Sequence, residues 1–127
     1  MAYNYRVRKK VDKTKPEKQV RYYAVPVSSK LISVKRLSRI ISDRCTLTGS
    51  DVVACIDALA HVIEEQIHDG NSVCLKGLGI FWLAASSPGF DTPEECTPSK
   101  VFAKRICFLP EMDLKKNLAN VEFTKVD

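Results

Sequence analysis

The residues of this sequence that could do chemistry are above all its positive charges, and they gather near the start of the chain. Residues 1–30 hold nine lysines and arginines against two acidic residues, a net charge of +7, while the chain as a whole carries +5. A basic segment attached to a nearly neutral body is typical of a protein that contacts an anionic polymer. A solubilising tail would have the same composition, so composition alone leaves both interpretations open.

The other reactive side chains form no arrangement that catalysis or metal binding requires. The five cysteines are odd in number and widely spaced, with no C-x-x-C pair, and we expect buried free thiols. His61 and His68 stand seven residues apart beside Glu64 and Glu65, which favours a solvated helix face over a metal site. No nucleophile has a nearby base, and no glycine-rich loop could hold a phosphate. We expect a protein that is not an enzyme, with no cofactor, no metal and no small-molecule substrate.

Length and hydropathy place the chain among ordinary soluble domains. A chain of 127 residues with 45% hydrophobic content fits one domain with a modest core. No run of about 18 apolar residues occurs, and the basic start lacks the apolar stretch of a signal peptide. We therefore expect a cytoplasmic protein with no membrane partner.

Two strands should precede the first helix. Tyrosines and valines recur among polar residues over 3–8 and 19–27, a pattern typical of strands. The charged stretch 9–18 between them contains a proline, which indicates a hairpin with a solvated tip. The sequence thus predicts a basic β extension over residues 1–30, attached to a domain over residues 31–127.

Capping signals predict two helices after this extension. Ser33 is a suitable N-cap for a helix whose apolar residues recur with a helical period. Thr48 and Asp51 form a capping box for a second helix, which we expect to run to about residue 69 and to stop at Gly70. The apolar residues of this second helix cover roughly half its circumference, more than a surface helix usually needs. A second copy of the chain would cover them, so the sequence predicts a homodimer.

A strand period follows the second helix. Apolar residues at strand spacing occupy 72–76 and 80–85, and Gly77-Leu-Gly79 between them indicates a tight turn. Residues 86–100 hold three prolines and little periodicity. This segment should therefore leave the sheet as a long excursion.

The chain then returns to the sheet and ends in two short elements. Residues 101–109 have the composition of a strand, and Pro110 is placed to begin a short helix with Leu114 and Leu118 on its buried side. Residues 121–126 alternate as a last strand.

Two motifs resemble a known family. Val73-Cys-Leu-Lys-Gly-Leu-Gly-Ile-Phe81 is similar to the signature turn of the HU and integration-host-factor family, and Ile106-Cys-Phe-Leu-Pro110 to its closing strand. The stretch Tyr22-Tyr-Ala-Val-Pro-Val-Ser28 resembles an HU-like branch of Bacteroides-type bacteria that has an N-terminal extension. The resemblance implies an α+β, IHF-like (HU-like) DNA-binding fold. That fold has a helical pair and a small antiparallel β-sheet with a long β-arm, here extended by N-terminal strands.

The resemblance also implies an architectural, histone-like function. In this family a dimer grips DNA with two β-arms in the minor groove, and a proline at each arm tip wedges between base steps. The chain should therefore bind and bend duplex DNA with little sequence specificity. Phe90 and Pro93 are the candidate wedges here, or they only shape the loop. The corresponding tip bears no cation before Lys100, and its acidic residues, which oppose phosphate, are Asp91, Glu94 and Glu95.

The positive charge lies instead in the N-terminal extension, so we expect many of the phosphate contacts there. Cations of the first helix and of the strand after the arm would assist them. The expected DNA-binding residues are Arg6, Arg8, Lys9, Lys10, Lys13, Lys15, Lys18, Arg21, Lys35, Arg36, Arg39, Lys100, Lys104 and Arg105. The expected partner is double-stranded DNA of the nucleoid, held by a homodimer. The alternative is a dimeric protein-interaction module on the same fold without DNA binding, which the acidic arm favours.

Overall fold

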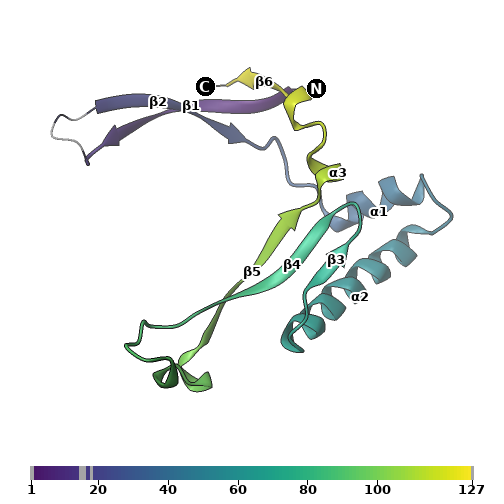
Figure 1. Ribbon diagram of the computed structural model, residues 1–127. Helices are drawn as coiled ribbons and strands as arrows, with labels where there is room; N and C mark the ends of the chain where they lie inside the picture. The colour runs from purple at the N-terminus through teal and green to yellow at the C-terminus, as the bar shows by residue number, and fades with distance from the viewer. Residues whose placement is uncertain (1, 15–16, 18, 127) are drawn as a thin grey trace.

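Two small sheets and a helical pair make up the chain (Figure 1). The structure is a computed structural model, and it describes residues 2–14, 17 and 19–126. Helices and strands mix in the order of two strands, two helices, three strands, a short helix and a last strand. The predicted α+β class is confirmed.

The N-terminal sheet joins the two ends of the chain. Strand β1 (Ala2–Asp12) pairs antiparallel with β2 (Gln19–Val27), and the last strand, β6 (Glu122–Lys125), lies parallel to β1 on its other side. The ring of Phe123 contacts Tyr3 and Tyr5, at 6.2 and 6.4 Å between ring centroids. The predicted hairpin is confirmed, although β1 continues into the charged stretch that we assigned to the connection. The parallel pairing of β6 was not foreseen.

The two predicted helices are confirmed together with their caps. Helix α1 (Val34–Ser42) begins after Ser33, whose hydroxyl accepts a hydrogen bond from the backbone N–H of Arg36 at 3.3 Å. Helix α2 (Gly49–His68) begins with the capping box, in which Thr48 and Asp51 exchange two hydrogen bonds of 3.2 Å. These bonds satisfy amide groups that have no acceptor within the first turn. The helix ends before Gly70, whose φ of +89° suits glycine.

The second sheet has the order β3-β4-β5, with β3 (Val73–Leu75), β4 (Gly79–Ser86) and β5 (Phe102–Pro110) all antiparallel to their neighbours. Its tight turn is held by Glu111, whose carboxylate accepts a hydrogen bond from Gly77 and whose own N–H donates to the carbonyl of Leu78. The rings of Phe81 and Phe108 pack across β4 and β5 at 4.8 Å. Between β4 and β5 the chain leaves the sheet, as expected, and forms two single 3-10 turns, Pro93–Glu95 and Pro98–Lys100.

The short helix differs from the prediction. Pro110 is the last residue of β5, and helix α3 (Met112–Lys115) begins two residues later. Leu114 and Leu118, which we placed on a buried side, are 51% and 62% exposed. Leu114 lies on the four-residue helix and Leu118 begins a separate 3-10 turn (Leu118–Asn120), and neither of these short elements is covered by another described element. The prediction of their burial was wrong for the single chain.

The interior of the single chain is very small. Among the described residues, only Val52 and Ile67 are buried apolar side chains, and both belong to the predicted apolar arc of α2. Four of the five cysteines are exposed and Cys107 is half-buried, so the expectation of buried thiols was wrong. Four of the cysteines lie in apolar runs of the sequence, but apolar neighbours along the chain do not by themselves provide a covering layer. No helix in the described part of the chain is both long enough and apolar enough to cross a membrane.

Candidate functional site

Strand register gathers four cations on one face of the N-terminal sheet. Side chains of a strand alternate between its two faces, and residues opposite each other in neighbouring strands share a face. Arg6 lies opposite Val25, Arg8 opposite Tyr23, and Lys10 opposite Arg21. Arg6, Arg8, Lys10 and Arg21 therefore stand on the same side as Tyr23. This set is called the cationic face below.

The four cations of the cationic face form no ion pair among the side chains that the structure describes, where the only such pair joins His68 to Glu64 on α2. By register, the positions of two acidic residues also share this face, Asp12 opposite Gln19 and Glu122 opposite Ala2, so cationic positions outnumber acidic positions by four to two. The Nε atom of Arg6 is buried and has no hydrogen-bond acceptor. Lys10 and Arg21 are directly opposite each other, and like charges in that position destabilise a strand pair. An external anion on this face would relieve the repulsion between Lys10 and Arg21.

The geometry of the cationic face suits an extended polyanion. Arg6, Arg8 and Lys10 follow one another along β1 at every second residue, a spacing of about 6.6 Å. The ammonium of Lys10 lies 6.0 Å from the ring centroid of Tyr23, and this cation–π contact holds the ammonium on the cationic face. Toward the hairpin tip the face opens into a groove of about 600 Å³, whose lining includes Lys10, Lys13 and Arg21. The site is a charged row on a ribbon, not an enclosed pocket.

Apart from Lys13, which lines the groove, the described residues among the other predicted DNA-binding residues lie away from this face. Lys9 falls on the opposite face of β1, because it lies between Arg8 and Lys10. Lys15 and Lys18 lie outside the described residues. Three cations, Lys35, Arg36 and Arg39, are exposed on α1, and Lys104 and Arg105 are exposed on β5.

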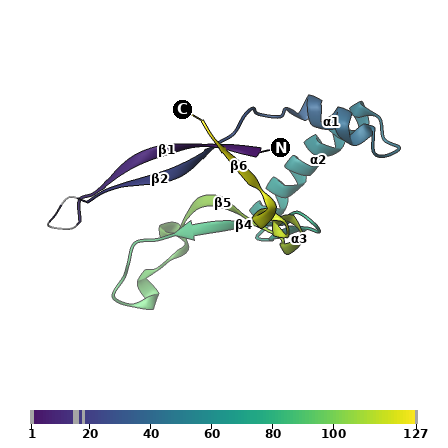
Figure 2. The same cartoon turned by 90° about the horizontal axis from the view of Figure 1, so that it is seen from above.

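The arm segment, residues 87–101, carries its negative charge on the surface. Its tip extends away from the helices, on the same side of the molecule as the hairpin tip (Figures 1 and 2). The ammonium of Lys100 lies 5.0 Å from the ring centroid of Phe90, which is half-buried, and Pro93 is exposed at the start of a 3-10 turn. The three acidic residues of the tip, Asp91, Glu94 and Glu95, are all exposed.

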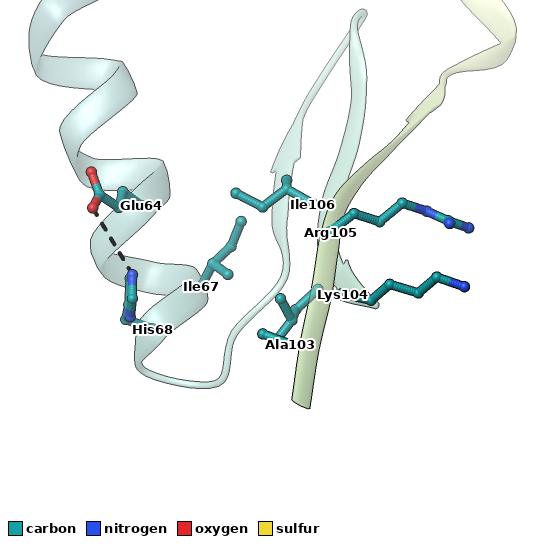
Figure 3. Close-up of a pocket in the computed structure, with 8 residues that line it drawn as sticks. Glu64, Ile67, His68, Ala103, Lys104, Arg105 and Ile106 are labelled. Atoms are coloured by element: carbon teal, nitrogen blue, oxygen red, sulfur yellow. Dashed lines mark ion pairs between the residues drawn. The ribbon is translucent and has the colours of Figure 1, made fainter. Parts of the chain in front are cut away.

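A second hollow lies between the end of α2 and the base of the arm (Figure 3). It has a volume of about 370 Å³ and an apolar wall to which Ile67, Leu83 and Ile106 contribute. His68 and Glu64 form an ion pair of 3.9 Å on α2 at its rim, whereas Lys104 and Arg105 point away from the helix. Among the described residues no group of three metal-ligating side chains occurs.

Sequence reasoning missed two features of the candidate site. It grouped Lys9 with the other cations, because a count of charges does not distinguish the faces of a strand. It also overlooked Tyr23 as part of the cationic face. The alternation of Arg6, Arg8 and Lys10 with other residues was the available signal, but it required β1 to continue beyond residue 8.

Comparisons with known proteins agree with the fold. No curated protein is similar enough in sequence to count as a relative. A crystal structure from Bacteroides vulgatus, provisionally described as a bacterial DNA-binding protein, matches with a TM-score of 0.57 and 12% sequence identity. The match covers 97% of this chain and 48% of the other, so this chain spans about half the length of that protein. At this identity the likeness shows a shared fold. Residues 1–125 match the family described as an HU domain fused to a wHTH, Ig or glycine-rich motif, and the chain belongs to that family.

Proposed function

We propose that this chain is an architectural protein that binds double-stranded DNA with little sequence specificity. The observation that carries the proposal is the cationic face, in which four cations without a described carboxylate partner follow the strands of an exposed ribbon. Lysine and arginine side chains on phosphates supply affinity that does not depend on base sequence. Membership in a family of HU domains and the likeness to a protein provisionally described as DNA-binding support the same partner.

The proposal also assigns separate roles to two parts of the fold, a body and an arm, as in HU-type proteins. Helices α1 and α2 with the β3-β4-β5 sheet would form the IHF-like body, and residues 87–101 would form its arm. The duplex would contact the cationic face first, assisted by cations on α1 and β5. These cations lie on three separate elements, and bending of the duplex toward all three is part of the proposal. Phe90 and Pro93 remain candidate wedges at the arm.

The proposed unit is a homodimer, and the exposed surface supports it. The single chain exposes 10,986 Å², whereas a compact chain of 14.3 kDa exposes about 6,800 Å². The excess of roughly 4,200 Å² per chain is larger than the share of about 1,000–2,500 Å² that each partner of an obligate interface usually buries. A dimer interface would account for part of this excess, and the projecting hairpin and arm for the rest. Exposed apolar side chains on the body, such as Leu59 and Val62 on α2 and Leu83 on β4, would then be covered. The dimer would act on chromosomal DNA in the nucleoid, without catalysing a reaction.

Binding to a random-sequence duplex, titrated with salt, tests the proposal. The unmodified chain should bind at low salt and lose affinity steeply as salt rises. A variant in which all four cations of the face are replaced (Arg6→Gln, Arg8→Gln, Lys10→Gln and Arg21→Gln) should bind at least tenfold more weakly with an unchanged circular dichroism spectrum. If the unmodified chain does not bind even at low salt, DNA binding is refuted. The dimeric interaction module would then be the better description.

A further inference from the structure

The face of the N-terminal sheet opposite the cationic face presents exposed aromatic rings. Register places Tyr3, Tyr5 and Tyr22 there with valines between them, and Phe123 of β6 pairs with Tyr3. Tyr3, Tyr22 and Phe123 are 42%, 67% and 59% exposed. This side of the sheet is called the aromatic face below.

No described element of the chain lies over the aromatic face. Strands β1, β2 and β6 contact one another extensively, but their contacts with α1, α2 and the second sheet are few. In Figures 1 and 2 the sheet stands apart from the helices, with its hairpin reaching into open space. A contiguous exposed patch of this kind is typical of an interaction site.

The charges on the aromatic face are all positive. Lys9 pairs with Tyr22, and Lys125 pairs with Tyr5. The strand pairs that the structure describes place no acidic residue on this side of the sheet. The same face of a second copy would therefore set lysines against lysines, whereas an anionic partner would be attracted.

Each lysine stands beside a ring, and a nucleotide offers a partner to both. Side chains directly opposite each other in neighbouring strands have Cβ atoms about 5 Å apart. A base stacked on Tyr22 would hold its phosphate near Lys9, and a base stacked on Tyr5 or Phe123 would hold its phosphate near Lys125. The two sets of ring and lysine are four residues apart along β1, about 13 Å. The aromatic face therefore combines stacking surfaces with cations at two successive places.

Unpaired bases suit this surface better than a duplex or a peptide does. The bases of a duplex are already stacked on one another, so they present edges and phosphates and leave no ring face free. An acidic peptide would use the lysines but not the rings. Exposed aromatic side chains beside cations are typical of proteins that bind single strands, in which successive bases stack on the rings.

We propose that the aromatic face binds single-stranded DNA, with about two or three bases stacked on its rings and phosphates on its two lysines. The choice of DNA rests on the proposed function, in which the cationic face of the same ribbon holds a duplex. Arg21 and Tyr22 are consecutive on the edge strand β2 and belong to opposite faces. An unpaired stretch that continues from the duplex would reach the aromatic face around this edge.

Adjacent tyrosines provide a matched pair of variants. Tyr22 belongs to the aromatic face and Tyr23 to the cationic face, and both variants keep every cation. The probe is a fluorescent oligothymidylate of about 16 nucleotides. Tyr22→Ser should bind it at least fivefold more weakly, whereas Tyr23→Ser and Tyr22→Phe, which keeps the ring, should stay within twofold of the unmodified chain. Circular dichroism checks that the sheet still forms.

The two neighbouring cations of β1 provide a second pair. With the oligothymidylate, Lys9→Gln should lower the slope of the logarithm of the binding constant against that of salt concentration by about 0.7 for each ribbon contacted. Arg8→Gln should lower that slope by less, because Arg8 lies on the cationic face. With a duplex the order of the two variants should be reversed.

Photochemical cross-linking locates the contact directly. A strand that carries 5-iododeoxyuridine should cross-link to Tyr22 or to the rings beside Lys125, as read by mass spectrometry of the peptides. Equal losses for Tyr22→Ser and Tyr23→Ser would overturn the proposal, as would cross-links confined to Tyr23, the helices or the arm. An oligouridylate RNA that bound tenfold more tightly than the DNA would overturn the choice of DNA.

The outcome is separable from that of the proposed function. A chain that binds a random duplex but not the oligothymidylate would refute the single-strand site alone. A chain that binds the oligothymidylate through Tyr22 but no duplex would support the site and refute duplex binding.

Discussion

Replacing Arg8 with glutamine should reduce the salt dependence of DNA binding, whereas the same change at its neighbour Lys9 should not. Arg8 stands on the cationic face and pairs with Tyr23, whereas Lys9 stands on the other face of the ribbon and pairs with Tyr22. Both side chains are exposed, both lose one positive charge, and glutamine preserves most of their length. The two variants therefore have the same net charge and differ in the side of the ribbon that is changed.

The expected magnitude follows from the number of phosphate contacts removed. Each contact contributes about 0.9 to the slope of the logarithm of the binding constant against the logarithm of salt concentration. A dimer contains Arg8 twice, so Arg8→Gln should lower the slope by about 1.8. Between about 50 and 200 mM salt, the unmodified chain should then lose roughly tenfold more affinity than the Arg8→Gln variant. The slope of Lys9→Gln should stay within about 0.5 of the unmodified value.

Fluorescence anisotropy of a labelled random duplex measures these slopes, at protein concentrations above that at which the dimer dissociates. Equal slopes for Arg8→Gln and Lys9→Gln would refute the assignment of faces, because a general effect of net charge would lower both. A lower slope for Lys9→Gln alone would mean that DNA lies on the face of the ribbon that carries Lys9.

The remaining predictions concern stability and the arm. Gly79→Ala should destabilise the chain by about 1–3 kcal/mol in chemical denaturation, because a Cβ there would collide with the carbonyl oxygen of Leu109. Gly89→Ala, where a Cβ would meet nothing within 4 Å, is the control and should change stability little. Thr48→Ala removes a hydrogen bond of the capping box and should cost about 0.5–2 kcal/mol; an unchanged unfolding midpoint would contradict that role. Pro93→Ala should leave the DNA bend measured by energy transfer unchanged if this proline only shapes the loop, and a loss of bending would show that it is a wedge.

The sequence predicted the local elements well because their causes are local. The N-cap of α1, the capping box of α2 and the glycine after α2 each depend on residues within one helical turn, and all three are present. The strand periods of the second sheet and the turn between β3 and β4 depend on equally short stretches. Such features require no knowledge of what packs on the other side of an element.

Features that depend on distant partners were missed or wrong. The pairing of β6 with β1 joins segments more than a hundred residues apart, and no local pattern in the sequence of β6 indicates that it pairs with β1. Burial of Leu114, Leu118 and the cysteines was expected from their apolar surroundings, yet apolar surroundings in sequence do not supply a covering layer in space. The position of Lys9 depended on how far β1 continues into a charged stretch, where composition favours a loop.

The division of charge between arm and ribbon bears on how a duplex would approach. In the mechanism that the family resemblance implies, the arm enters the minor groove, and its tip must then tolerate phosphates on both sides. Here Asp91, Glu94 and Glu95 are exposed at the tip, and the nearby cation, Lys100, lies over the ring of Phe90. The ribbon has the opposite character, because on one face four cations outnumber two acidic residues and form no ion pair among the described side chains. The hairpin of β1 and β2 and the arm extend to the same side of the molecule (Figure 2). The hairpin would attract a duplex placed beside them, and the acidic arm tip would repel it. Electrostatics therefore favours a duplex lying along the hairpin, with the arm tip turned away from the phosphates.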